Sequence, residues 1–218
     1  MGKSLYSLLL SDEVVEGIDR IALRNGISRS ALVDRILAEY ASVQTPQMRI
    51  NNIFRQMEQL MDAAGGIVPM FSEGQQSMVM KSSLQYKYRP TVKYAVSLYD
   101  HIDEAGRIGE LAVNFRTQSQ ALLSEIGRFF EVLSLLEAGS EKGRFADGAV
   151  RRTLEDGKFT RTLAIPRDTA YTADQLGELI SDYVRKFDAL MNGWLSSGGS
   201  TQALSESFSR MFPDGINI

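Results

Sequence analysis

The single histidine of the chain lies in a run of acidic residues, YDHID, where a metal site is the first chemistry to consider. Imidazole and carboxylate groups are common ligands of divalent metals. The candidate ligands are Asp100, His101, Asp103 and Glu104. Adjacent residues in a turn seldom converge on one ion, and one histidine without a second is a weak ligand set. We therefore interpret this run as a solvated turn between strands, and we expect no metal or other cofactor.

A second run with chemical potential, KSSLQYKYRPTVKY, combines cations with tyrosines and contains no acidic residue. Its cations are Lys81, Lys87, Arg89 and Lys93. Interleaved cations and aromatic rings can bind the backbone and bases of a nucleic acid. The simpler interpretation, which we adopt, is that Lys87 and Lys93 solubilise the outer face of a sheet or protect its edge.

Composition and motif content reduce the number of function classes to consider. The sequence has no glycine-rich phosphate loop, nucleophile elbow or zinc signature, so we do not expect an enzyme. The net charge is −3, so any contact with nucleic acid must come from a local patch. The absence of cysteine is compatible with the reducing cytoplasm. Apolar runs are too short for a signal peptide or a membrane span, so we expect a cytoplasmic protein with no membrane partner.

The N-terminal residues predict a strand followed by two helices. Residues 4–11 alternate in a way that gives one fully apolar face, formed by Tyr6, Leu8 and Leu10. Ser11 and Ser28 are typical N-caps, and Gly26 is typical of the end of the first helix. A unit of about 40 residues buries too little surface to be stable alone. The strand also has no partner within the unit, so we expect it to pair with the same strand of a second copy.

This N-terminal stretch resembles the ribbon-helix-helix fold of the MetJ/Arc/CopG superfamily. The resemblance covers about 40 residues: the strand YSLLLS, the helix DEVVEGIDRIALRNG, the turn IS and the helix RSALVDRILAEY. It implies an intertwined homodimer whose two strands enter the major groove of double-stranded DNA. The implied DNA-binding residues are Lys3 before the strand, Leu5, Ser7 and Leu9 facing the groove, and Ser28, Arg29 and Ser30 at a phosphate.

The groove-facing positions depart from the usual chemistry of base readout. Leucine cannot form hydrogen bonds with base edges, so Leu5 and Leu9 could only contact thymine methyl groups or another protein. Residues 1–43 also carry five basic and six acidic residues. Two functions therefore stay open. The first is a homodimeric DNA-binding transcriptional regulator, and the alternative is an interaction or assembly factor that uses this fold only to dimerise.

The rest of the chain predicts an α+β domain over residues 48–197, with a tail at 198–218. We expect helices near 48–64, 118–138 and 172–197, and strands within 78–88, 91–100, 109–118 and 158–167. The polar, glycine-bearing segment 138–157 predicts a connection that is mobile in part. Short connections favour an antiparallel sheet with helices packed on one side. This domain would bind a protein or small-molecule effector, or extend the oligomer beyond the dimer.

Overall fold

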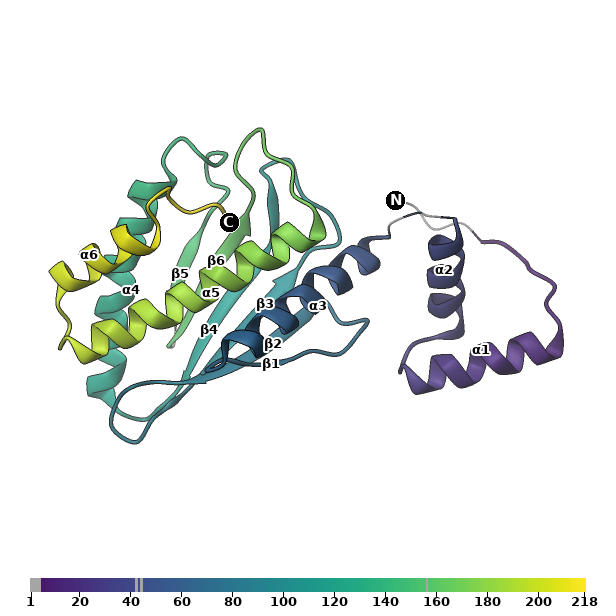
Figure 1. The fold of residues 1–218 in the computed structure, drawn as a ribbon, viewed down its shortest axis with the longest axis horizontal. Helices are drawn as coiled ribbons and strands as arrows, with labels where there is room; N and C mark the ends of the chain where they lie inside the picture. Colours follow the sequence, from purple (N-terminus) through teal and green to yellow (C-terminus); the bar gives the residue numbers. More distant parts are fainter. Residues whose placement is uncertain (1–4, 42, 44, 156) are drawn as a thin grey trace. The chain divides into compact units, whose positions relative to one another are not determined.

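The computed structural model describes residues 5–41, 43, 45–155 and 157–218, which form six helices and one six-stranded sheet (Figure 1). The chain divides into two compact units, Met1–Met48 and Arg49–Ile218. The first unit contains α1 (Asp12–Arg24) and α2 (Arg29–Tyr40). Both helices lie where the sequence predicts them.

The second unit is an α+β domain, as the sequence predicts. Its helices are α3 (Pro46–Ala64), which begins just before the unit boundary, α4 (Gln120–Glu141), α5 (Ala173–Ser196) and α6 (Thr201–Met211). Its strands are β1 (Val68–Met70), β2 (Ser77–Ser83), β3 (Thr91–Leu98), β4 (Arg107–Arg116), β5 (Arg152–Glu155) and β6 (Lys158–Ala164). All pairings are antiparallel, in the order β1-β2-β3-β4-β6-β5.

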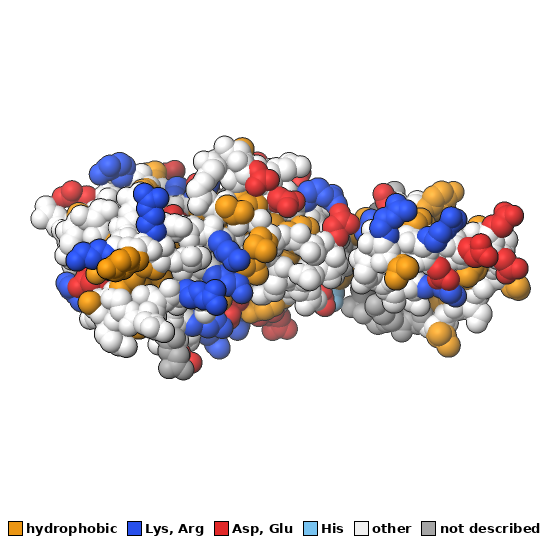
Figure 2. Space-filling view, turned by 90° about the horizontal axis from the view of Figure 1, so that it is seen from below, with side chains coloured by type: hydrophobic (Ala, Val, Ile, Leu, Met, Phe, Trp, Pro, Cys, Tyr) orange, Lys and Arg blue, Asp and Glu red, His pale blue; other side chains and the backbone are white. Residues whose placement is uncertain are grey.

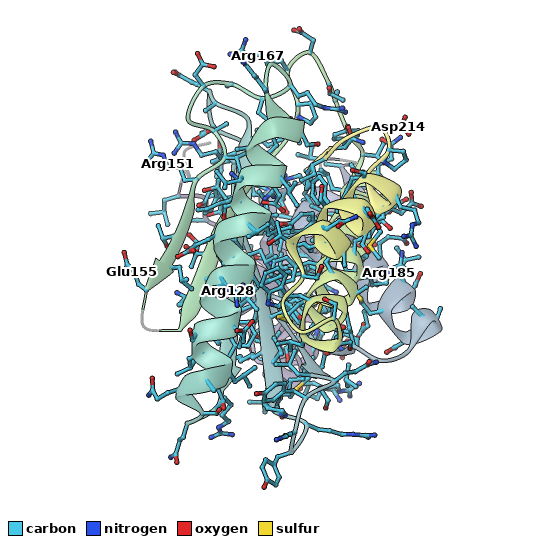
Figure 3. All side chains as sticks on the ribbon, turned by 90° about the vertical axis from the view of Figure 1, so that its left-hand side faces the viewer. Arg128, Arg151, Glu155, Arg167, Arg185 and Asp214 are labelled. Carbon is cyan, nitrogen blue, oxygen red and sulfur yellow. The ribbon has the colours of Figure 1, made fainter. Side chains whose placement is uncertain are left out.

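The helices cover one face of this sheet. In Figure 3, Arg151 and Glu155 mark the strand side, whereas Arg185 and Asp214 lie on the opposite, helical side. Along β3, Val92, Tyr94 and Val96 are fully buried, while Thr91 and Lys93, on the alternate positions, are exposed. Because side chains alternate along a strand, one face of the sheet carries the core and the other stays open.

Aromatic rings form the centre of the core. Phe130 stacks on Phe159 of β6 with ring centroids 4.1 Å apart, and Phe187 of α5 lies against both rings. Helices α3 and α5 approach closely at Gly177, where a Cβ atom would lie 2.8 Å from the Cβ of Gln56. Only glycine allows this contact without displacing α3.

Three expectations for this unit were wrong. The expected tail belongs to the folded unit, because α6 and the residues after it bury Leu204, Phe208, Ile216 and Ile218 in the core. Segment 138–157 was expected to be a connection without helix or strand, mobile in part. It instead contains the end of α4, which runs to Glu141, and the edge strand β5, which pairs with β6. The strand expected through residue 88 ends at Ser83, since the chain turns there to reach β3.

A buried network of charges joins α4, the last strands and α5. Arg161 is fully buried, and its guanidinium donates to Glu141 at 2.8 Å and to the main-chain oxygen of Ile218 at 2.6 Å. Arg152 donates to Glu137 at 2.7 Å and also contacts Glu141. The Tyr183 hydroxyl donates to Glu137 at 2.5 Å, and Arg161 lies over its ring. Two arginines thus balance two glutamates in a site without bulk water.

This environment shifts the acid–base behaviour of its members. Burial raises the pKa of Tyr183 well above its ordinary value, and the charge of Glu137 adds to that effect. Burial also raises the pKa of Tyr94, whose hydroxyl donates to Asp188 at 2.6 Å. Burial alone would lower the pKa of Arg161, but Tyr183, Glu137 and Glu141 together raise it. Arg161 therefore stays charged in the core.

The two buried tyrosines predict a loss of stability in alkaline solution. Unfolded tyrosine ionises near pH 10, whereas these two stay protonated in the folded chain, so the unfolded state binds fewer protons above that pH. The free energy of unfolding should fall by about 1.4 kcal/mol per pH unit for each tyrosine. Urea unfolding at several pH values from about 9 to 11 measures this slope of the free energy of unfolding against pH.

Tyr94→Phe should remove about half of that slope, because one of the two groups no longer titrates. Tyr88→Phe is the matched control, since Tyr88 is fully exposed. Equal slopes in the wild-type protein and in Tyr94→Phe would contradict the prediction.

Candidate nucleic-acid interface

The N-terminal segment has no regular secondary structure in the single chain. The sequence predicts a strand over residues 4–11, but the described part, 5–11, belongs to no helix or strand. This expectation is not met within one chain, because a strand requires the backbone of a neighbour to pair with. Lys3, an expected DNA contact, lies outside the described residues.

The side chains of this segment are exposed to unequal degrees. Leu5 and Leu9, the expected groove-facing leucines, are 99% and 104% exposed. On the expected core face, Tyr6, Leu8 and Leu10 are 83%, 59% and 42% exposed. Ser7 is exposed as well. All described residues of the segment are therefore exposed in the single chain, and Leu8 and Leu10 are less so than Leu5 and Leu9.

The two helices that follow bury little of their own apolar surface. Among the described residues of this unit, the buried hydrophobic side chains are those of Ala22, Leu32 and Ala38. Most of the larger apolar side chains at helical spacing are open, since Val14 and Ile21 of α1 and Ile36 and Tyr40 of α2 are exposed. Figure 2 shows hydrophobic side chains standing out separately on the surface of this unit. A single copy thus lacks an adequate core.

The turn between the helices has the geometry that the sequence predicts. Gly26 takes a positive φ of 65°, and the amide of Ile27 donates back to the main-chain oxygen of Ala22 at 3.0 Å. This pattern ends a helix in the left-handed conformation that glycine favours. Ser28, the N-cap of α2, follows directly after this turn, so the turn fixes the position of the N-terminus of α2.

The structure brings the three expected phosphate contacts together at the start of α2. Ser28 caps the helix, and its hydroxyl accepts from the amide of Ala31 at 3.2 Å. The amides of Arg29 and Ser30 belong to the first turn, where a helix has no internal acceptor for them. A helix N-terminus of this kind attracts anions.

Arg29 already has an anionic partner within the chain. Its guanidinium binds both carboxylate oxygens of Asp19 on α1, at 2.6 and 2.5 Å. The side-chain hydrogen bond from Arg29 is the main cause of the lowered pKa of the Asp19 carboxyl. Asp19 was not among the expected site residues. The two residues are ten positions apart on different helices, so no helical spacing rule relates them.

The lysine and tyrosine run, residues 81–94, does not form one surface. Lys81 and Lys93 lie on the open face of the sheet, whereas Tyr94 points into the core. Tyr86 packs partly against the core, and Lys87, Tyr88 and Arg89 lie in the turn between β2 and β3. Strand alternation thus separates the cations from two of the three tyrosines, which weakens a stacking surface for bases.

The aspartates near His101 organise the connection between β3 and β4. Asp103 accepts from the amides of Ala105 and Arg107 at 3.0 and 2.9 Å, and Asp100 accepts from Gln76 at 2.7 Å. Within the described part of the chain, no three His, Asp or Glu side chains are grouped so as to hold a metal ion. Among those same residues, no helix is long and apolar enough to cross a bilayer.

Comparisons of the whole chain with models of protein families, with curated proteins and with solved structures give no match. The geometry of the two units is therefore the basis for the function proposed below.

Proposed function

We propose that this chain is a homodimeric, cytoplasmic DNA-binding transcriptional regulator of the ribbon-helix-helix type. Residues 1–43 would form the dimer and contact double-stranded DNA. The second unit would bind an effector or a partner, or mediate further association.

One observation is the main support for a dimer. Most of the large exposed hydrophobic side chains of the described chain belong to the first unit, although that unit is the smaller one. They include Leu8, Leu10, Val14, Ile21, Ile36 and Tyr40. With only Ala22, Leu32 and Ala38 as buried hydrophobic side chains, the described part of this unit lacks a core of its own, and a unit of about 40 residues needs a further partner to be stable. A second copy supplies both the missing partner of segment 5–11 and a shared core.

The start of α2 supports a contact with the DNA backbone. A capped helix N-terminus offers free amides, and Arg29 adds a cation beside them. In the free protein, the Asp19 carboxylate neutralises part of the positive charge of Arg29. A phosphate would therefore compete with Asp19 for the Arg29 guanidinium.

This competition predicts opposite effects for two substitutions. Asp19→Asn should strengthen duplex binding roughly threefold to tenfold, because it frees Arg29 for a phosphate. Arg29→Ala should weaken binding and lower the slope of log affinity against log salt by about 1. Titration of labelled duplex pools of mixed sequence between about 50 and 200 mM salt measures both effects.

Glu16→Gln is the control, since it makes the same change in net charge on α1 at an exposed position. It should alter affinity less than Asp19→Asn does. A dimer that shows no duplex binding at about 50 mM salt, where phosphate contacts are strongest, would exclude DNA as the partner.

A second candidate function rests on Leu5 and Leu9. Their nearly complete exposure favours a protein partner as much as DNA, because leucine forms no hydrogen bonds with bases. In that case the chain is an interaction or assembly factor that dimerises through the same fold. A stable dimer without affinity for duplex DNA would support this candidate.

A further inference from the structure

The open face of the sheet carries a trough of about 780 Å³ in the second unit. Its floor is formed by β2, β3 and β4, and the residues that follow β1 form a wall at one side. This volume lies in the range of small-molecule sites in proteins. Figure 2 shows blue Lys and Arg side chains gathered beside orange hydrophobic ones on the larger unit.

The floor of the trough presents three cations on three neighbouring strands. Lys81 lies directly opposite Lys93, and Arg116 lies opposite Thr91, two positions along β3 from Lys93. All three cations are exposed and project from the open face, because the core residues alternate with them. Like charges at directly opposite positions of two strands destabilise a sheet.

These three cations form no ion pair among the described residues, and no described acidic residue lines the trough. The surface ion pairs elsewhere in this unit show that other arginines do find acidic partners. A bound anion would relieve the repulsion between Lys81 and Lys93.

The same trough also has an apolar side. Met70, 53% exposed, lies opposite Val79 across the β1–β2 pairing, and both line the trough. The aromatic lining residues Phe71 and Phe115 pack back toward the core, at 5.1 Å from Phe54 and 5.8 Å from Phe130 between ring centroids. They are not free to stack on successive bases, which argues against a single-stranded nucleic acid as the occupant.

We propose that this trough binds a small organic anion that has an apolar body. The anionic group would lie between Lys81, Lys93 and Arg116, and the apolar body would lie against Met70 and Val79. The site belongs entirely to the second unit, so it does not depend on whether the first unit binds DNA.

The dye 1-anilinonaphthalene-8-sulfonate tests this site in the full chain, because it combines a sulfonate with an apolar ring system. The double variant Lys81→Gln, Lys93→Gln should raise its dissociation constant roughly tenfold or more, since two charge-assisted contacts are lost. Lys142→Gln, an exposed lysine at the end of α4 and outside the trough, should change it less than about twofold. Circular dichroism establishes that each variant is folded.

The uncharged analogue N-phenyl-1-naphthylamine distinguishes the contribution of charge to the binding affinity from the contribution of apolar contact. Its affinity should be the same in the wild-type chain and in the double variant. Unchanged affinity for the sulfonate dye, or an equal loss of affinity for both dyes, would overturn the proposal. Loss of duplex binding in the double variant with unchanged dye affinity would also overturn it, and would assign this face to nucleic acid.

Discussion

Replacing Leu8 and Leu10 together by serine should convert the proposed dimer into a monomer and abolish the proposed duplex binding. These leucines are the less exposed members of segment 5–10, and they occupy the face expected to be covered in a paired ribbon. Fully burying an exposed leucine contributes about 1.5–3 kcal/mol, and Leu8 and Leu10 are about half exposed in the single chain, so four leucines per dimer contribute about 3–6 kcal/mol. The dimer dissociation constant should therefore rise by about two to four orders of magnitude. Analytical ultracentrifugation over a concentration series measures it.

The opposite face of the same segment provides the matched control. Leu5→Ser with Leu9→Ser removes the same amount of apolar side chain, but at positions expected to face away from the dimer core. This variant should remain dimeric and bind duplex DNA as tightly as the wild type, or more tightly. If it dissociates as readily as the Leu8, Leu10 variant, the assignment of the two faces is wrong. A higher assembly that only this control variant loses would favour the interaction-factor function.

Arg161→Met should destabilise the second unit by about 3–5 kcal/mol, because it leaves a buried carboxylate without its cation. Arg161 is fully buried between Glu137, Glu141 and Tyr183, and methionine retains much of its volume but none of its charge. Urea unfolding measures the change. Trp194, the single tryptophan and itself buried, reports the transition by fluorescence.

Two further variants isolate the role of charge. Arg167→Met breaks an exposed pair with Asp147 and should cost less than about 1 kcal/mol. Adding Glu141→Gln to Arg161→Met should recover part of the lost stability, since one remaining arginine then faces one buried carboxylate. An Arg161→Met protein that unfolds at the same urea concentration as the wild type would show that the network contributes no net stability.

Local signals in the sequence predicted several elements of the fold correctly. Gly26 and Ser28 placed the turn between α1 and α2, because a left-handed helix end and a side-chain cap depend only on neighbouring residues. Thr172 and Gln175 form the reciprocal capping box at the start of α5 that their spacing predicts. The alternation of Val92, Tyr94 and Val96 identified the core face of β3.

Two elements of the second unit were missed for different reasons. Strand β5 has a polar, largely exposed sequence that gives no apolar alternation, although only two residues separate it from its partner β6. The segment after Ser197 contains enough small and polar residues to predict a tail, yet its few apolar side chains reach a core built by α4 and α5. The spacing of Leu204, Phe208 and Phe212 indicates a short amphipathic helix, which is α6, but local spacing does not show that this helix joins the core of the unit.

For the candidate sites, the sequence by itself pointed to the residues at the start of α2 and to the apolar N-terminal segment, and it suggested the second copy that we propose. Those inferences follow from caps, from alternation and from the small size of the unit. Only the tertiary structure decided that Asp19 holds Arg29, that Arg161 is buried among carboxylates and that Lys81 and Lys93 share an open trough. Each depends on which elements lie side by side, because electrostatic interactions act through space over a few ångströms and not along the chain.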